Sequence, residues 1–211
     1  IESFSVLKDA SAAAIYGTRA ANGVILIKTK GGEKGKSVVD YNGQFTVENM
    51  LNSPDVLSAE QYNSIAGSTD YGDNTNWFEQ ITRQALTHAH GLSFSGGSDK
   101  STYRISANYR NGEGVALNSG YEQYNGRINF SQNAFNDKLK LDLILSTTLR
   151  NEDNPIYDAF GFATVFNPTA PINSSDEFDY GTEWGGYFQQ PAFNFYNPLA
   201  VLEQNSKDAK K

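Results

Sequence analysis

Residues 37–150 alternate apolar and polar positions in five separate stretches. Successive side chains of a β-strand point to opposite faces, so a period of two predicts strands with one apolar and one polar face. We expect antiparallel strands in sequential order at 37–48, 90–97, 101–111, 121–132 and 138–150. The apolar faces carry Tyr103, Ile105, Ile128, Phe130, Leu139, Leu141, Leu143 and Leu145, and the polar faces carry Arg104, Arg127, Asp142 and Arg150.

The connections between these strands are in turn long, short, moderate and short, and a long segment follows the last strand. Outer-membrane barrels have short periplasmic turns and longer outer loops. The stretch 37–48 also has the length of a tilted membrane-spanning strand. The pattern therefore predicts a mainly β protein, a partial antiparallel transmembrane β-barrel of about five strands with its apolar face toward lipid. A soluble all-β binding module, with the strands forming a sandwich, is the alternative.

Two long segments, 49–88 and 151–200, lack this alternation and are expected to be outer loops. The second is rich in Pro, Asn and aromatic residues, and we expect it to be without regular structure. Residues 197–203 should lead into a further strand.

Local signals predict two helices within the first of these loops. Ser58 and Gln61 form a capping box in the helical stretch 55–66. A second short helix is expected at 77–84, where Asn76 can accept from the free N–H groups of the first turn.

The segment 1–32 has a different pattern, that of a strand–helix–strand unit. Residues 4–8 favour a strand, and the Ala-rich residues 10–16 favour a helix, with Asp9 as its cap. Residues 24–29 form a continuous apolar run, which predicts a strand buried on both faces.

Within this unit, residues 7–32 read LKDASAAAIYGTRAANGVILIKTKGG. This sequence closely resembles the end of the plug domain in the SusC/RagA family of TonB-dependent outer-membrane transporters. The resemblance implies that residues 1–32 are the C-terminal part of a plug domain. It implies that residues 33–211 are the N-terminal part of a barrel of about 22 strands.

The same resemblance implies a nutrient importer in the bacterial outer membrane, driven by TonB, whose contact box lies upstream in that family. It implies a SusD-like outer-membrane lipoprotein as a lid over the barrel. Family substrates are mostly oligosaccharides and sometimes peptides. A TonB-dependent siderophore receptor shares the fold and is a further alternative.

Composition narrows the possible functions. The net charge of −7 argues against a nucleic-acid partner, which requires a basic face. The absence of cysteine excludes a disulfide scaffold and a thiolate metal site. No catalytic motif is present, so we expect neither an enzyme nor a cofactor. The start without Met or a signal peptide predicts a piece of a longer protein.

Aromatic side chains in the outer loops are the candidate substrate-binding residues, because a flat ring can stack on a sugar. The alternative is that they pack within their own loop or against a partner protein. The candidates are Trp77, Tyr157, Phe160, Trp184 and Tyr187.

Metal sites are not expected. His88 and His90 lie beside a strand without further ligands and are interpreted as polar residues at a loop–strand junction. An Asn/Asp-rich stretch could offer calcium ligands but lacks EF-hand spacing, and a plain turn explains it better. Its residues are Asp70, Asp73, Asn74 and Asn76.

Overall fold

The computed structural model describes residues 1–8, 14–17, 20, 22–174, 185–190, 195–204 and 208–210. The described strands form one two-stranded and one six-stranded sheet. Among the described residues, no helix has the length and apolar character needed to cross a membrane. The chain packs as two units. Unit 1 comprises Ile1–Asp40, Leu92–Ser106 and Gly126–Ser146, and unit 2 comprises Tyr41–Gly91, Ala107–Asn125 and Thr147–Lys211.

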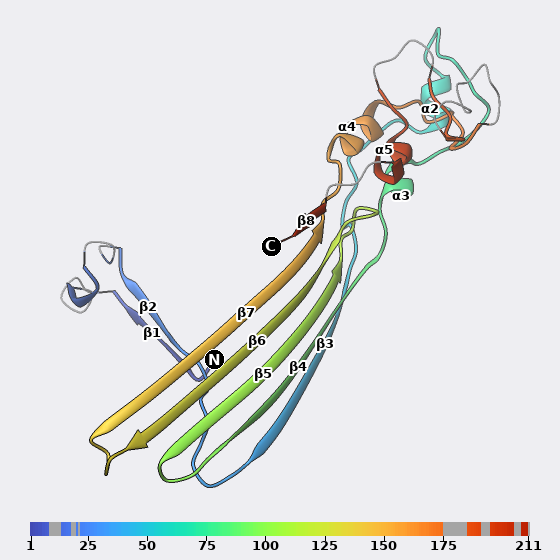
Figure 1. Ribbon diagram of the computed structural model, residues 1–211. Coiled ribbons are helices and arrows are strands. Elements are labelled where there is room, and N and C mark those ends of the chain that lie inside the picture. Colours follow the sequence, from blue (N-terminus) through green and yellow to red (C-terminus); the bar gives the residue numbers. More distant parts are fainter. Residues whose placement is uncertain are drawn as a thin grey trace. The chain divides into compact units, whose positions relative to one another are not determined.

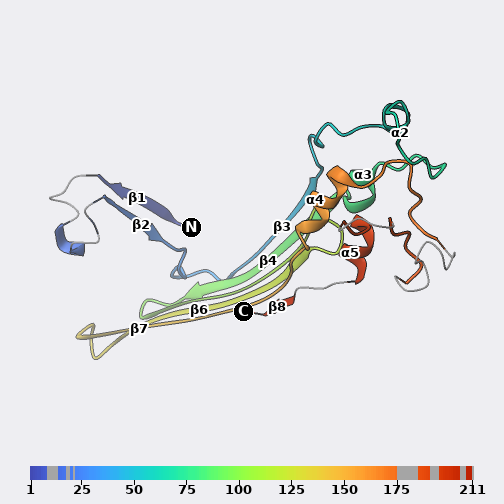
Figure 2. The ribbon, with the colours of Figure 1, turned by 90° about the horizontal axis from the view of Figure 1, so that it is seen from above.

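The two-stranded sheet is a ribbon of β1 (Ser3–Leu7) and β2 (Val24–Lys28), which pair antiparallel (Figure 2). Between them lies a 3-10 helix, η1 (Ala14–Tyr16), at the end of the predicted helical stretch. The predicted cap Asp9 and residues 10–13 lie outside the described residues.

The prediction that β2 is buried on both faces is wrong. The side chain of Ile25 is 66% exposed and that of Ile27 is 60% exposed. A two-stranded ribbon pairs its backbone groups but has no second layer to cover its faces. The apolar run therefore identifies a strand in the described part of the chain without burying it.

Five long strands lie side by side in sequence order in the second sheet (Figure 1), which confirms the predicted order. Their bounds are β3 (Val38–Glu48), β4 (Ala85–Gly97), β5 (Ser101–Glu113), β6 (Gly120–Ala134) and β7 (Leu139–Asp153). A short sixth strand, β8 (Asp208–Lys210), pairs antiparallel with the end of β7.

β4 begins at Ala85, earlier than the predicted start at residue 90. The missed residues place Ala85 and Thr87 on one face, and small or polar side chains give only a weak apolar alternation. Both are buried in the structure. Pairing with β3 and β5 decides the strand here, because strand preference depends on neighbours more than on intrinsic propensity.

In unit 1, the connector between β2 and β3 is held against the β4–β5 turn. The Gly35 N–H donates to the Gly97 carbonyl at 3.0 Å, and the Ser37 and Tyr103 hydroxyls lie 3.3 Å apart. Gly32 packs closest of all. A Cβ there would lie 2.6 Å from the Tyr103 nitrogen and 2.7 Å from the Gly96 carbonyl oxygen.

We expect Gly32→Ala to lower the yield of folded full-length receptor sharply, because the new methyl group meets the backbone of two paired strands. The fraction of receptor that stays folded in unheated SDS measures the effect. Gly31→Ala is the matched control, since a Cβ at Gly31 meets nothing within 4 Å. Equal yields for the two variants would refute the close packing of Gly32.

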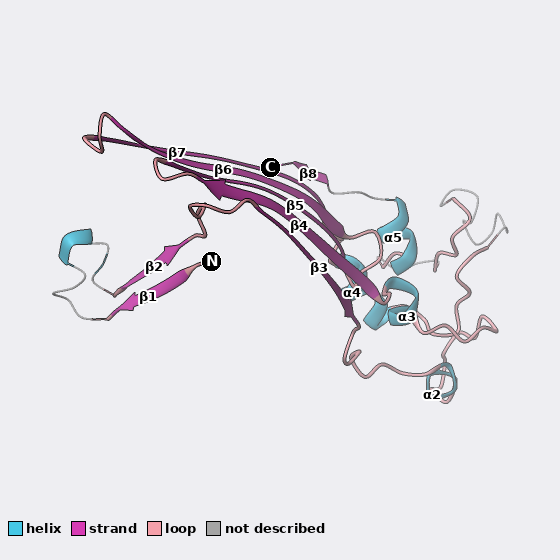
Figure 3. Cartoon of the chain, turned by 90° about the horizontal axis from the view of Figure 1, so that it is seen from below, coloured by secondary structure: helices cyan, strands magenta, loops and turns pink. Residues whose placement is uncertain are grey.

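The described part of unit 2 contains four short helices, which lie in the segments that connect or follow the long strands (Figure 3). They are α2 (Ala59–Asn63), α3 (Trp77–Ile81), α4 (Asp158–Val165) and α5 (Pro198–Gln204). The predicted capping box of Ser58 and Gln61 is confirmed at the start of α2, and Asn76 caps α3.

The segment 151–200 has more regular structure than predicted, because it contains α4 and the start of α5. Of residues 197–203, which were expected to lead into a further strand, 198–203 are helical in α5, and the strand β8 follows. These helices pack with α3 around a shared core. The buried core residues are Trp77, Phe78, Ile81, Ala159, Ala163, Phe166, Ala170, Phe188 and Leu202.

Candidate functional site

The polar face of the sheet in unit 1 borders a cavity of about 810 Å³. Arg104 and Asp142, both predicted for the polar face, line it together with Asn129. The Arg104 guanidinium donates to the Ser93 hydroxyl at 2.7 Å. The base of the β1–β2 ribbon and the connector close the other side, with Glu2, Lys28–Glu33 and Lys36. The cavity is therefore hydrophilic and carries side chains of both charges.

The polar face in unit 2 holds a second group of charged side chains around Tyr121. The Arg150 guanidinium carbon lies 4.0 Å from the Tyr121 ring centroid, and that of Arg110 lies 5.5 Å away. Arg150 also donates to Gln123 at 3.0 Å and to Glu152 at 3.1 Å. Both units thus present amide, hydroxyl and charged groups on one face of the sheet.

The opposite face of the sheet is apolar and aromatic. In unit 2 the Tyr41 hydroxyl lies 2.7 Å from His90 Nδ1, and His88 contacts the Tyr109 ring. In unit 1 the Phe94 and Tyr103 rings pack together with centroids 5.4 Å apart. Aliphatic side chains of β7 are exposed on this face: Leu139, Leu141, Leu143, Leu145 and Leu149.

The two histidines lie within β4. The interpretation that they are at a loop–strand junction is therefore wrong. The His90 ring stacks on Tyr41 and meets Phe45 edge-on, and the His88 ring is tilted against Phe45 and Tyr109. In the described part of the chain, no three His, Cys, Asp or Glu side chains come together as metal ligands. Asp70 instead bonds within its own loop, to Asn63 and to the Gly72 N–H.

The predicted sugar-binding aromatics do not form one platform in the described structure. Trp77 is 2% exposed, and its indole N–H donates to the Asn167 carbonyl at 3.0 Å. Phe160 packs against the same core. Burial of these rings matches the alternative that the sequence left open, in which loop aromatics pack within their own loop.

Two of the remaining aromatic candidates, Tyr157 and Tyr187, are nearer the surface. Tyr157 is 73% exposed at the start of α4. The Tyr187 hydroxyl donates to the Glu203 carboxylate, and this hydrogen bond raises the pKa of Tyr187 to about 12. Trp184 lies outside the described residues.

Sequence analysis missed a cavity of about 350 Å³ in unit 2. Three segments form it: residues 56–62, 74–77 and 163–168. None of its described lining residues is charged, and its walls combine aliphatic and aromatic groups with the polar side chains of Ser58, Thr75 and Asn76. Only folding brings these segments together, so no local signal in the sequence marks the cavity.

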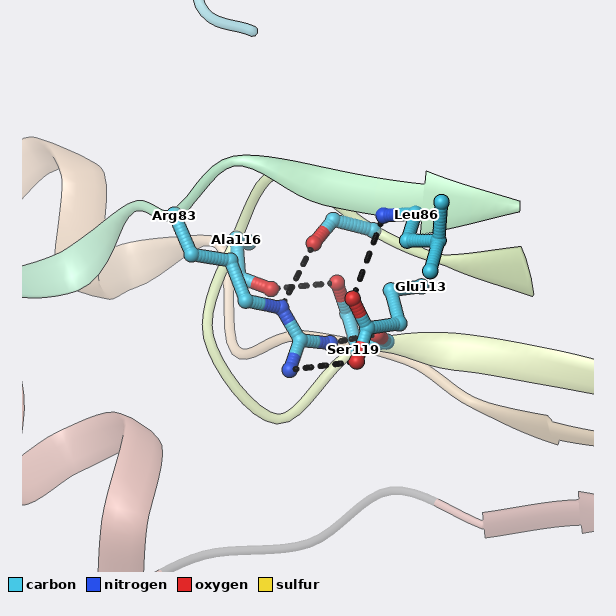
Figure 4. Close-up of polar contacts among 6 residues, drawn as sticks. Arg83, Leu86, Glu113, Ala116 and Ser119 are labelled. Carbon is cyan, nitrogen blue, oxygen red and sulfur yellow. Dashed lines mark hydrogen bonds and ion pairs between the residues drawn. The ribbon is translucent and has the colours of Figure 1, made fainter. Parts of the chain in front are cut away.

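Arg83 fastens the β5–β6 loop to the start of β4 (Figure 4). Its guanidinium donates to the carbonyls of Gly114 at 3.1 Å and Ser119 at 2.9 Å. It also lies 3.5 Å from the Glu113 carboxylate, which accepts from the Leu86 N–H. A planar guanidinium can reach both carbonyls at once.

We expect Arg83→Lys to loosen this loop, because a single ammonium cannot make the same fork of bonds. Hydrogen exchange at the Gly114 and Leu117 amides should become roughly tenfold faster, as the loss of one or two net hydrogen bonds implies. Arg127→Lys is the control, since one hydrogen bond from Arg127, to Asn129, is seen in the described structure. Unchanged exchange in Arg83→Lys would contradict the role of Arg83.

Two curated relatives match nearly the whole chain, and a third matches more than half of it. TonB-dependent receptor SusC of Bacteroides thetaiotaomicron is 36% identical over 99% of the chain, which spans 23% of that protein. TonB-dependent receptor P26 of Formosa agariphila is 30% identical over 99% of the chain and 22% of its own length. TonB-dependent receptor P3 of the same organism is 41% identical over 59% of the chain and 13% of its length. The chain thus spans about a quarter or less of each relative.

Solved structures agree. The RagAB peptide importer in its open-open state aligns with 73% of this chain and 22% of that chain, with a TM-score of 0.60 and 27% identity. Its closed-closed state aligns with 71% of this chain at a TM-score of 0.59 and 28% identity. No protein-family model matches the chain.

All these relatives are receptors or importers and not enzymes. TonB-dependent receptors are outer-membrane proteins. The matches agree with the family resemblance of residues 7–32. They extend it to the strands and helices that follow. The chain therefore belongs to the SusC/RagA family of TonB-dependent outer-membrane receptors.

Proposed function

We propose that the chain forms part of a TonB-dependent nutrient importer, in which β3–β7 contribute to the wall of a transmembrane barrel. The observation that carries this proposal is the division of the sheet into one polar and one apolar face. In a membrane the apolar face, with Leu141 and Leu143, turns to lipid, and the polar face, with Arg104 and Arg150, turns to the lumen. A closed barrel of about 22 strands is the fold that this family implies.

The connections support the same orientation. Residues 98–100 and 135–138 make short turns at one end of the strands, whereas the long segments 49–84 and 154–207 leave the other end. Short turns lie on the periplasmic side in outer-membrane barrels. The helices α2–α5 therefore belong to the outer surface in this proposal.

Residues 1–32 act in this proposal as the end of the plug domain. The connector between β2 and β3 borders the polar face of the sheet, where Lys30 and Glu33 share a cavity with Arg104 and Asp142. A plug within a barrel requires such a hydrophilic boundary, because buried charges need polar partners or water.

The solute is an oligosaccharide or a peptide in this proposal. The RagAB structures are of a peptide importer with two components, which supports a SusD-like lipoprotein as partner over the outer loops. TonB supplies the energy. Among the described candidates, Tyr157 is the exposed one and can meet a solute or partner. Trp77 and Phe160 pack in the core around α3–α5, and Tyr187 bonds to Glu203.

Uptake in cells tests this function. Deleting the full-length receptor gene should abolish uptake of a labelled oligosaccharide or peptide that supports growth of the parent strain. Deleting TonB should do the same, and restoring the receptor should restore uptake. Unchanged uptake of glycans and peptides, with loss of iron-chelate uptake instead, would favour the siderophore receptor.

A further inference from the structure

The Tyr121 ring, on the polar face of unit 2, occupies the space above Gly112, where a side chain would otherwise lie. A Cβ on Gly112, on the neighbouring strand β5, would come within 2.7 Å of the Tyr121 ring and 3.0 Å of the Thr87 hydroxyl. Any side chain at position 112 would therefore displace the ring. Gly112 lets Tyr121 lie across β5, where Arg110 and Arg150 approach it.

Arg150 is oriented by three contacts. Its guanidinium carbon is 4.0 Å from the Tyr121 ring centroid, a cation–π distance. Its Nη1 donates to Gln123 and its Nε donates to Glu152. The side chain remains 29% exposed, so it is held in position while part of it faces solvent.

Arg110 is the less restrained cation of the pair. Its guanidinium carbon lies 5.5 Å from the same ring, and the residue is exposed. None of the ion pairs between described residues includes Arg110. A guanidinium over an aromatic ring keeps its N–H donors for a further partner. Of the two cations, Arg150 is therefore ion-paired with Glu152, whereas Arg110 has no ion-pair partner among the described residues.

We propose that Arg110, Tyr121 and Arg150 form a subsite for a carboxylate group of the imported solute. The proposal rests on the importer function and specifies the class of solute. A carboxylate matches the fork of guanidinium donors, and Arg–carboxylate pairs are among the stronger polar contacts in proteins. The neighbouring amide and hydroxyl groups of Gln123, Asn125 and Thr148 suit the uncharged remainder of a polar solute. The carboxylate belongs to a uronic-acid sugar or to an acidic peptide.

Binding to the purified full-length receptor in detergent, at low salt and pH 7, tests the subsite by calorimetry. Trigalacturonic acid is compared with neutral maltotriose, and triglutamate with triglutamine. At least one acidic probe should bind more tightly than its neutral match. Arg110→Gln should weaken acidic binding about tenfold, as expected for one charge-assisted hydrogen bond, and leave neutral binding unchanged. The acidic probe that binds identifies the source of the carboxylate.

Two controls separate local from general charge effects. Arg110→Lys should retain part of the affinity, because it keeps the charge. Lys138→Gln removes a positive charge from the exposed β6–β7 turn and should change nothing. Equal binding of acidic and neutral probes, no binding of either acidic probe, or no effect of Arg110→Gln in a folded receptor would overturn the subsite. The last result is also expected if an acidic side chain of the receptor occupies it.

These outcomes are distinct from failure of the importer function. Binding to purified receptor needs no TonB, so loss of the subsite leaves TonB-dependent uptake of neutral solutes intact. Conversely, uptake that does not depend on TonB would overturn the importer without changing the calorimetric result.

Discussion

Leu143→Arg is expected to destabilise the folded receptor in a bilayer by about 2–4 kcal/mol, the cost of an arginine on the lipid face near the membrane midplane. Leu143 lies near the middle of the run of exposed leucines from Leu139 to Leu149 on the apolar face of β7, and its side chain is half exposed in the described structure. In the proposed barrel that exposed surface is covered by lipid, where a guanidinium loses its hydration. Urea unfolding of the full-length receptor in lipid vesicles measures the change.

The adjacent residue provides the control. Ile144 is also aliphatic and exposed, but it lines the hydrophilic cavity with Lys140 and Asp142. Ile144→Arg should therefore cost much less than Leu143→Arg. Equal costs at the two positions would contradict the assignment of the faces, and a larger cost at Ile144 would reverse it.

Asn197→Asp should destabilise the packing of α5 against the core formed with α3 and α4 by about 2–4 kcal/mol, because it replaces a buried amide donor with a carboxylate oxygen. The Asn197 side chain is fully buried. Its Nδ2 donates to the carbonyls of Ile172 at 3.0 Å and Phe188 at 3.1 Å. Its Oδ1 accepts from the Leu199 and Ala200 N–H groups at the start of α5. Aspartate keeps the cap but places an oxygen against two carbonyl oxygens.

Hydrogen exchange at the Phe188 and Ala200 amides measures this loss of stability, because it becomes faster when the structure around Asn197 opens more often. Asn49→Asp is the matched control, because exposed Asn49 accepts from Gln84 through its oxygen and aspartate keeps that acceptor. Similar exchange in the two variants would show that the Asn197 donors are not needed.

The elements that sequence predicted well depend on local rules. The alternation Leu139, Leu141, Leu143 identifies a strand because side chains alternate across any β-strand. The Ser58–Gln61 capping box and the Asn76 cap each join residues three positions apart, so both are readable without the fold. The start of β4 at Ala85 was missed because small and polar residues weaken the alternation.

The core around α3, α4 and α5 was not predictable, since the residues that form it are distant in the sequence. Trp77 bonds to Asn167, and Thr75 bonds to Ala170. A pattern of Pro, Asn and aromatic residues does not specify such pairs. Trp77 was a plausible sugar-binding residue by type, but packing decides whether a ring is a ligand surface or a core side chain.

The same limit applies to the Tyr121 group. Arg150 was predicted for the polar face, yet its contact with Tyr121 requires the register of three strands and a glycine at position 112. The sequence identifies the face on which such groups lie, and the structure identifies which of them meet.

Cysteine labelling along β7 tests most directly whether the sheet is a membrane wall. This chain contains no cysteine, and single cysteines are introduced at 140–146 of a full-length receptor from which any other cysteines have been removed, in outer-membrane vesicles. A lipid-soluble maleimide should label positions 141, 143 and 145, and positions 140, 142, 144 and 146 should be spared by it. Labelling that does not alternate from one residue to the next would contradict the account. Labelling of 140, 142, 144 and 146 by the lipid-soluble maleimide, with 141, 143 and 145 spared, would contradict it as well.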